Sequence, residues 1–335
     1  MKISVITPSY NQGQYLEQTI QSVINQNYDH LEYIVIDGGS DDNSVEIIKK
    51  YEAHLSYWES KKDKGQSEAI NKGLKKSTGD ILIWINSDDV LLTGALKTAS
   101  ELFQSLPSTA GVIHGGTLLF NEEKDLHTVY TYGKPSLEKY LSGMAFSQPS
   151  AFFKREYLER VGCLREDLHY GMDYDLFARL ACVSQFYPVQ TVFSKYRLHD
   201  ESKSVAHSEK FRKDWDEVFL SICELLGWED VKDQLSEFIS VSHSNTHSFS
   251  FHPDPLIVGK ANKQKTLFYF LSDILLHYYW YDEREKGREL LNKMKKAFPR
   301  GWFKEDERVS AVIQKLSIPE PILKGLKKLR GIGKG

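Results

Sequence analysis

The chain reads ILIWINSDD over residues 81–89, where an apolar run leads directly into a polar and acidic turn. Two earlier segments have the same form: ISVIT over residues 3–7 precedes Pro8-Ser9-Tyr10-Asn11, and YIVI over residues 33–36 precedes Asp37-Gly38-Gly39-Ser40-Asp41. Residues at helical spacing lie between these runs. Alternating strand and helix patterns, with strands that are apolar throughout, indicate a parallel sheet covered on both faces. Because ligands bind at the carboxyl ends of strands in such sheets, we expect the three turns to gather along one rim.

The pattern changes twice further along the chain. Residues 110–200 mix short helices with predicted strands near 111–119, 126–132, 148–153 and 187–197. After about residue 206, apolar spacing predicts helices over 208–226, 230–240, 264–298 and 304–316. A stretch rich in Ser, His, Asn and Pro predicts a loop over 242–262. The sequence therefore predicts an α/β domain over residues 1–205 and an α-helical C-terminal region over residues 206–335.

Composition is that of an ordinary globular protein. Of 335 residues, 41% are hydrophobic and 27% charged, and the net charge of −3 argues against nucleic acid as a partner. The three cysteines, Cys163, Cys182 and Cys223, fit no zinc spacing and no disulfide framework. No apolar run reaches the roughly 18–20 residues that span a bilayer. Met1 leads directly into a predicted strand, without a signal peptide, so we expect a cytoplasmic protein.

Two of the turns contain carboxylates that are suited to bind a metal ion or a ligand. Asp88 and Asp89 are adjacent, and a bound cation would relieve their repulsion; Mg²⁺ and Mn²⁺ prefer such oxygen ligands and complete their shell with water and phosphate oxygens. The alternative is that Asn86-Ser87-Asp88-Asp89 only forms a turn and caps the next helix. Asp37 can accept a hydrogen bond from a base or a ribose hydroxyl. Its loop lacks the three-glycine fingerprint, which argues against a Rossmann cofactor site.

Six segments, in order and at similar spacing, resemble the family 2 glycosyltransferases. The resemblance covers about residues 1–205. Its segments are Val5-Ile6-Thr7-Pro8-Ser9-Tyr10-Asn11, residues 34–44 (IVIDGGSDDNS), residues 63–73 (DKGQSEAINKG), Ile85-Asn86-Ser87-Asp88-Asp89, Gly171-Met172-Asp173-Tyr174-Asp175-Leu176 and Tyr196-Arg197-Leu198-His199.

This resemblance implies the GT-A fold: a mostly parallel central sheet flanked by helices, with a nucleotide-sugar half over 1–115 and an acceptor half over 116–205. It implies transfer of a sugar, with inversion, from a nucleoside diphosphate donor. The residues that match the family's donor-binding positions are Thr7, Pro8 and Tyr10 beside the base, Asp37 on the base or ribose, Asp63 and Gly65 in a second loop, and Asn86 and Ser87 in the metal motif. Asp88 matches the metal ligand. The family's first Asp is replaced by Asn86, which costs one charge but keeps an acceptor oxygen.

Further positions follow from the same resemblance. Asp173 matches the catalytic base, and Met172 stands where the family usually has a Glu. Asp173 and Asp175 also begin a helical segment, where carboxylates are favoured by the helix dipole alone. His199 matches a metal or diphosphate ligand. Gln148, Asp89 and Asp175 are predicted to contact the acceptor or the donor sugar; Gln148 could equally begin an ordinary strand.

The main hypothesis is a metal-dependent inverting glycosyltransferase that uses Mn²⁺ or Mg²⁺. A UDP-sugar is the expected donor, although another nucleotide stays open, and the resemblance suggests a surface polysaccharide or lipid-linked glycan as acceptor. A nucleotidyltransferase is disfavoured because residues 8–13 contain no basic side chain to grip phosphate. A non-catalytic nucleotide-sugar or glycan-binding module with a degenerate site is the alternative, motivated by Asn86 and Met172. Oligomerisation is left open.

The last residues form a separate feature. Residues 321–335 contain no acid and place apolar residues and lysines at amphipathic spacing. Such a basic tail could bring the protein to the inner face of an anionic membrane as a peripheral contact, or it could be solvated.

Overall fold

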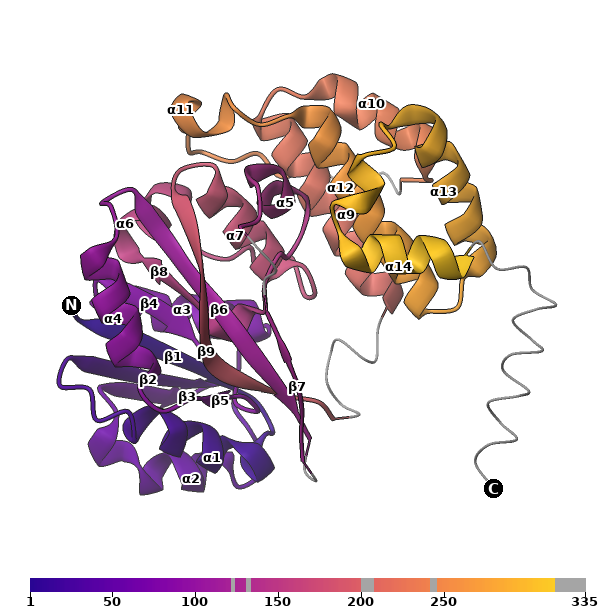
Figure 1. Cartoon of the computed structure of the whole chain (residues 1–335). Helices are drawn as coiled ribbons and strands as arrows, with labels where there is room; N and C mark the ends of the chain where they lie inside the picture. Colours follow the sequence, from indigo (N-terminus) through magenta and orange to yellow (C-terminus); the bar gives the residue numbers. More distant parts are fainter. Residues whose placement is uncertain (122–123, 131–133, 200–207, 242–245, 317–335) are drawn as a thin grey trace, which may run out of the picture. The chain divides into compact units, whose positions relative to one another are not determined.

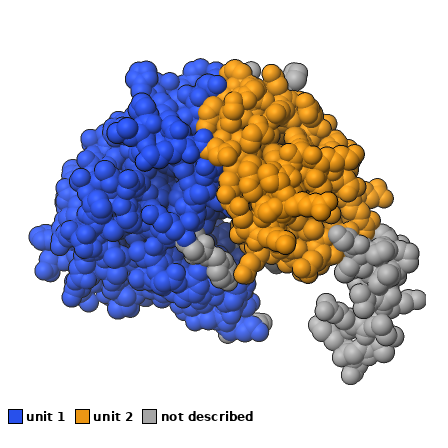
Figure 2. Space-filling model, turned by 45° about the horizontal axis from the view of Figure 1, so that its top comes forward, with its two compact units in different colours: residues 1–227, 244–261 blue, residues 228–243, 262–335 orange. Residues whose placement is uncertain are grey.

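The computed structural model describes residues 1–121, 124–130, 134–199, 208–241 and 246–316. The chain divides into two units, shown in Figures 1 and 2: unit 1 comprises residues 1–227 and 244–261, and unit 2 comprises residues 228–243 and 262–335. Unit 1 contains the sheet and unit 2 is helical. The predicted boundary at residue 205 falls outside the described residues and stays a prediction. Nevertheless, helix α9 (Ser208–Leu225), which follows that boundary, belongs to unit 1.

Unit 1 is built on a nine-stranded sheet of order β3-β2-β1-β4-β8-β6-β9-β5, with β7 paired to β6. The strands are β1 (Ile3–Ser9), β2 (Leu31–Asp37), β3 (Tyr57–Ser60), β4 (Ile81–Trp84), β5 (Val90–Leu91), β6 (Ala110–Phe120), β7 (Asp125–Val129), β8 (Ala151–Lys154) and β9 (Gln185–Arg197). Strands β3, β2, β1 and β4 are mutually parallel, and β6 is parallel to β9, whereas β8 is antiparallel to both β4 and β6. This architecture confirms the predicted α/β fold with a helical C-terminal region.

Helices cover the sheet of unit 1 and make up unit 2 (Figure 1). In unit 1 they are α1 (Gly13–Ile24), α2 (Ser44–Lys50), α3 (Gln66–Lys76), α4 (Ala95–Ser105), α5 (Leu137–Ser142), α6 (Arg155–Val161), α7 (Met172–Ala181), α9 and α11 (Pro255–Val258). In unit 2 they are α10 (Glu229–Phe238), α12 (Lys263–Trp280), α13 (Arg284–Ala297) and α14 (Glu307–Leu316). No described helix is long and apolar enough to cross a membrane.

Burial on both faces explains why the parallel strands are apolar throughout. In β2, Val35 belongs to a buried cluster with Leu16 of α1. Its neighbours Ile34 and Ile36 point to the other face and pack with Ala69 of α3. Since successive side chains of a strand alternate between faces, a strand covered on both sides needs apolar residues at every position.

The helical part differs from the prediction at one place. A single helix was predicted over 264–298, but the structure has α12 and α13 separated by a turn at 281–283. Asp282 adopts a φ of 59°, a left-handed conformation that Asp tolerates better than most residues. Apolar residues keep helical spacing on both sides of the turn, so periodicity alone does not reveal it. The unit 2 core includes Phe268 of α12, whose ring lies 5.4 Å from Phe298 and 5.0 Å from Phe303.

A buried histidine in β6 makes the stability of unit 1 pH-dependent. His114 is fully buried, its Nε2 lies 2.9 Å from the Tyr140 hydroxyl, and its ring stacks on Phe146. Burial lowers the pKa of His114 to about 3. The unfolded chain takes up this proton first, near its ordinary pKa of about 6.5, so the free energy of unfolding falls as the pH decreases from about 6.5 toward 3.

We expect urea unfolding measured from about pH 7.5 down to about pH 5 to give a flatter pH dependence for His114→Gln than for the wild type. The glutamine keeps a polar group near Tyr140 but does not titrate. Equal slopes for the two proteins would contradict this assignment.

Candidate active site

Two polar loops meet at the carboxyl ends of β1 and β2, as the sequence predicts. Ser9 and Asp37 are register partners at the ends of the two strands. The loops then cross-link, because the Asn11 N–H donates to Ser40 Oγ at 2.8 Å and the Asp41 N–H donates to Asn11 Oδ1 at 3.0 Å. The loops after β1 and β2 are therefore held together by hydrogen bonds, and they form the first part of the candidate site.

The Asp37 carboxylate lies at the centre of this pair. Its Oδ2 accepts hydrogen bonds from the N–H groups of Gly39 and Ser40, at 3.0 and 2.9 Å, and from Ser60 Oγ at 2.7 Å. Its Oδ1 accepts from Ser40 Oγ at 2.5 Å. Ser60 is the last residue of β3, so the loop after β2 and the end of β3 together hold this carboxylate in place.

The loop of Asp63 and Gly65 adjoins Asp37. The Lys61 N–H donates to the Asp37 carbonyl at 2.9 Å, and a Cβ added at Gly38 would lie 2.9 Å from Asp63 Oδ2. Gly65 has a φ of 132°, which side-chain-bearing residues rarely adopt, and its N–H donates to Asp63 Oδ1 at 2.9 Å. Burial, with a smaller contribution from Asp37, raises the pKa of Asp63. Two carboxylates thus gather at this edge.

The three positions predicted in the first loop differ in accessibility. Tyr10 is 61% exposed and can stack on a ligand. Pro8 is buried in β1, and Thr7 is buried with its Oγ1 hydrogen-bonded to the Tyr33 hydroxyl at 3.1 Å. Among these three, only Tyr10 presents a side chain at the rim.

The acidic turn after β4 is ordered by a buried carboxylate. Asp89 is fully buried, and its two oxygens accept from the Arg197 N–H at 3.1 Å and from Asn86 Nδ2 at 3.2 Å. Burial, and next the charge of Asp88, raise the pKa of Asp89 well above its usual range. The carbonyls of Ser87 and Asp89 accept from one hydroxyl, that of Thr19, at 2.8 and 2.7 Å. Asp89 thus shapes the turn from inside.

The structure brings Asp88 and His199 together from segments 111 residues apart. His199 Nε2 lies 3.0 Å from Asp88 Oδ2, and the two side chains are 10% and 24% exposed. Arg197 supports this contact, because its Nε donates to the Asp88 carbonyl at 3.0 Å. Its guanidinium lies 4.5 Å from the Tyr15 ring and 4.4 Å from the Phe120 ring. Arg197, the last residue of β9, thus holds the turn after β4 against the end of that strand.

The donor set of Asp88 and His199 fits a divalent cation. A carboxylate oxygen and an imidazole nitrogen lie 3.0 Å apart on two partly exposed side chains, and both groups are common metal ligands. In the part of the chain that the structure describes, no group of three or more His, Cys, Asp or Glu forms a protein cage. Mg²⁺ and Mn²⁺ are often bound by one or two side chains plus water and substrate phosphates, so two protein ligands suffice.

The N-terminus of α3 links this turn to the predicted base. Gln66 Nε2 donates to Asn86 Oδ1 at 2.8 Å, and the next residue, Ser67, donates from its Oγ to Met172 Sδ at 2.8 Å. Met172 is the first residue of α7, followed by Asp173, whose Oδ1 accepts from the Tyr174 N–H at 2.8 Å. The position that usually carries a Glu in the family therefore forms a buried thioether contact with α3.

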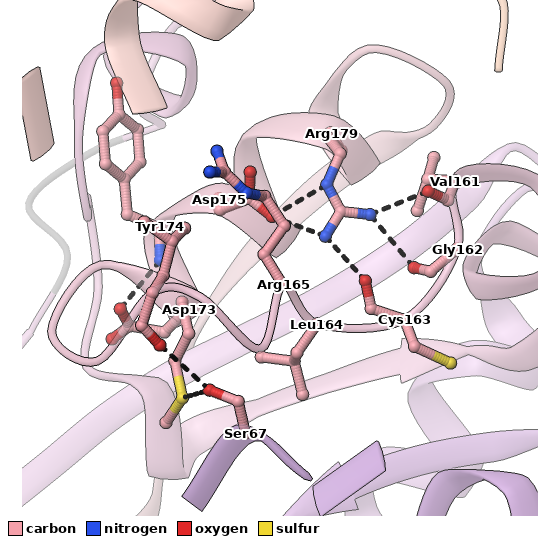
Figure 3. A network of polar contacts seen from close by, with 12 residues as sticks. Ser67, Val161, Gly162, Cys163, Leu164, Arg165, Asp173, Tyr174, Asp175 and Arg179 are labelled. Atoms are coloured by element: carbon pink, nitrogen blue, oxygen red, sulfur yellow. Dashed lines mark hydrogen bonds and ion pairs between the residues drawn. The ribbon is translucent and has the colours of Figure 1, made fainter. Parts of the chain in front are cut away.

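Asp173 and Asp175 point to different surroundings, as Figure 3 shows. Asp175 is fully buried, and its Oδ2 accepts from Nε and Nη2 of Arg179 at 2.9 and 2.6 Å. Arg179 also donates to the carbonyls of Val161, Gly162 and Cys163. This arrangement ties α7 to the end of α6 and does not place Asp175 beside Asp173.

Gln148 is likewise directed into the fold. It is 8% exposed, and its Nε2 donates to the carbonyl of Trp84, the last residue of β4, at 2.9 Å. It starts a 3₁₀ turn before β8. In the structure, the side chains of Gln148, Asp89 and Asp175 all make contacts within the fold. Their predicted contacts with the acceptor or the donor sugar stay predictions.

Sequence reasoning missed the supporting residues of the site. Thr19, Ser60 and Gln66 each hold a loop or turn through the side-chain hydrogen bonds described above. Thr19 and Ser60 lie on regular elements and Gln66 begins a helix, so their types and spacing carry no signal of their own. Only the strand register and helix packing identify them.

The mostly parallel sheet of unit 1, with polar loops at the carboxyl ends of its strands, agrees with the GT-A architecture that the resemblance implies. Residues 4–162 match the model of the family described as glycosyl transferase family 2. That match covers less than half of the chain, and it confirms the resemblance that the sequence motifs indicate.

Similar proteins carry the same assignment. An uncharacterised glycosyltransferase of Rickettsia typhi is 28% identical over 59% of this chain and 64% of that protein. One from Nostoc sp. is 30% identical over 48% of this chain and 53% of that protein. The chain therefore spans less than two thirds of the length of these curated relatives.

Solved structures share the fold at low identity. Residues 1–349 of TarS from S. aureus, in complex with UDP-GlcNAc, match with a TM-score of 0.58 and 16% identity, covering 90% of this chain and 93% of that one. The mannosyltransferase PcManGT from Pyrobaculum calidifontis, in complex with GDP-Man and Mn²⁺, matches with a TM-score of 0.51 and 16% identity, covering 93% of this chain and 85% of that one.

Proposed function

We propose that this chain transfers a sugar from a nucleoside diphosphate sugar to an acceptor hydroxyl, with inversion at the anomeric carbon. The observation that carries the proposal is the meeting of Asp88 with His199, from distant segments, at the edge that also holds Asp37 and Asp63. Ligands bind at the carboxyl-terminal edge of a parallel sheet, and a partly exposed carboxylate and imidazole at that edge are groups that can hold a metal ion and its diphosphate.

The donor half of the site is assigned to the loops after β1, β2 and β3. Tyr10 is exposed enough to stack on the nucleobase. Asp37, held by its own loop and by Ser60 of β3, is assigned to the base or the ribose, and Asp63 and Gly65 border the same nucleotide. UDP is the favoured nucleotide, which the UDP-GlcNAc in the TarS structure supports; the GDP-Man in the other neighbour makes GDP the second choice to test.

The diphosphate is assigned to the acidic turn. Asp88 and His199 would hold Mn²⁺ or Mg²⁺, with Asn86 and Ser87 next to them; PcManGT was solved with Mn²⁺. Such an ion, when bound, supplies positive charge that neutralises a departing diphosphate. Asp89 and Arg197 keep the turn in the conformation that presents Asp88.

Asp173 is assigned as the general base. Its carboxylate accepts the proton of the acceptor hydroxyl while that oxygen attacks the anomeric carbon and the bond to the diphosphate oxygen breaks. The attack from the face opposite the leaving group inverts the anomeric configuration. Met172 stands where the family usually has a carboxylate, and its buried thioether contacts Ser67, so that position offers the acceptor no carboxylate here.

The acceptor is proposed to be a growing glycan or a lipid-linked glycan. Peripheral membrane contact through residues 321–335 belongs to the same proposal and concerns residues outside the described part. Neither the acceptor nor the oligomeric state bears on the donor chemistry, which is therefore the part to test first.

A thermal-shift screen tests the donor site. We expect UDP with Mn²⁺ to raise the Tm of the wild type more than GDP, CDP or dTDP does, because a ligand that binds only the folded state stabilises it by mass action. The shift should need Mn²⁺ and should vanish in Asp88→Ala. Glu101→Ala is the matched control: it removes an exposed carboxylate of α4, whose nearest cation, Lys97, lies 4.0 Å away.

Absence of a shift with every nucleotide would overturn the donor-site assignment. A shift without release of nucleoside diphosphate from any donor sugar would instead favour the non-catalytic binding module. Release that depends on Asp88 would establish a transferase with a competent donor half.

A further inference from the structure

Helix α9 reaches the segment that leads into the proposed base. Asp214 Oδ2 accepts hydrogen bonds from three successive backbone N–H groups, those of His169, Tyr170 and Gly171, at 2.9, 2.7 and 3.3 Å. Gly171 is the N-cap of α7, so Asp173 is two residues further on. A single carboxylate oxygen thus organises the backbone immediately before the helix that carries Asp173.

Aromatic packing fixes α9 beside this segment. The ring of Phe211 lies 4.9 Å from that of Tyr170, and the ring of Trp215 lies 5.2 Å from that of Tyr174. Phe211, Asp214 and Trp215 are spaced i, i+3 and i+4, so they lie on one face of α9. This face meets residues on both sides of Asp173 in the sequence, and all of it belongs to unit 1.

The approach of the two backbones is close. A Cβ added at Gly171 would lie 3.0 Å from Asp214 Cβ. Gly171 has a φ of −118°, which any residue adopts, so the glycine is needed here for space and not for conformation. The Gly171 carbonyl then accepts from the Asp175 N–H at 2.9 Å, which closes the first turn of α7.

We infer that Asp214 is a positioning residue for Asp173, an inference that rests on the proposed function. Three amide dipoles directed at one charged oxygen form charge-assisted hydrogen bonds, which are stronger than neutral ones. They hold the start of α7 in one conformation, and Asp173 with it. Asp214 contacts neither the acidic turn nor the loops of Asp37 and Asp63 in the described structure, so it acts on the acceptor side alone.

The first measurement is amide hydrogen exchange of a peptide that covers residues 168–172, in the full chain. We expect Asp214→Ala to exchange faster there than the wild type, and Asp214→Asn to stay close to it, because all three bonds go to one oxygen and the amide of Asn keeps one. Asp216→Asn is the control on the same helix; Asp216 pairs with Arg212 at 2.6 Å instead.

The second measurement is transfer kinetics with the donor found by the screen. Asp214→Ala should lower kcat by roughly 10- to 100-fold, the cost of a misplaced catalytic group, without change in the donor KM or in the UDP-dependent Tm shift. Asp214→Asn should restore most of the rate. In Gly171→Ala the added methyl group would crowd Asp214 Cβ. This variant should also lower kcat, with donor binding unchanged.

The outcomes separate two failures. A wild type that transfers no sugar would remove the proposed function, and the positioning role with it. A transferring wild type whose Asp214→Ala variant keeps its kcat, or keeps slow exchange at 168–172, would overturn this inference alone. If Asp214→Ala does not fold, Gly171→Ala with the wild-type kcat would do the same.

Discussion

Replacement of Asp173 by Asn should lower kcat by about 10²- to 10⁴-fold, the usual contribution of a general base. The amide keeps an oxygen that can accept from the Tyr174 N–H, so α7 should form normally. It cannot take a proton from the acceptor, and the attacking oxygen must then lose that proton unaided. Steady-state transfer assays over a range of acceptor concentrations measure the effect.

Donor binding provides the internal check on this result. Because the Asp37 and Asp63 loops and the acidic turn are unchanged, UDP with Mn²⁺ should raise the Tm of Asp173→Asn as in the wild type. Glu159→Gln, which neutralises an exposed carboxylate on α6, serves as the control for a lost charge. A variant with the wild-type kcat would remove Asp173 from the mechanism, and loss of UDP binding as well would indicate a donor-side role.

Replacement of Asp175 by Ala should lower the free energy of unfolding of unit 1 by about 3–5 kcal/mol, the typical cost of leaving a buried charge without its partner. Arg179 is 1% exposed and would keep the carbonyls of Val161, Gly162 and Cys163 as neutral hydrogen-bond partners in place of the carboxylate. In a domain of this size the Tm should fall by roughly 6–20 °C. Urea and thermal unfolding measure both quantities.

Two further variants make the stability result specific. Asp175→Leu combined with Arg179→Met replaces the ion pair by apolar groups and should recover much of the lost free energy. Glu101→Ala breaks only the exposed pair with Lys97 and should change stability by less than about 1 kcal/mol. If Asp175→Ala were as stable as the wild type but had a raised acceptor KM, Asp175 would be an acceptor contact as the sequence suggested.

Much of this protein could be predicted from short contiguous patterns. The runs at 3–7, 33–36 and 81–85 predicted the parallel strands, because a strand covered on both faces must be apolar at every position. The polar residues that follow each run then had to meet at one rim, since parallel strands end on the same side. The positions of Asp37 and Asp88 at that rim follow from this local information, whereas Asp63 was assigned only through the family resemblance.

Other features depend on contacts between distant segments, which no local pattern encodes. The pairing of Asp88 with His199 requires that β9 end beside the turn after β4. The burial of Asp175 against Arg179, while Asp173 stays more accessible, depends on how α7 packs on α6. The role of Asp214 depends on α9 joining unit 1, although the change to helical patterning near residue 206 suggested a separate region. The sequence thus determined the strands and the rim through local hydrophobic patterning, whereas packing in three dimensions decided which carboxylates meet a ligand and which hold the fold.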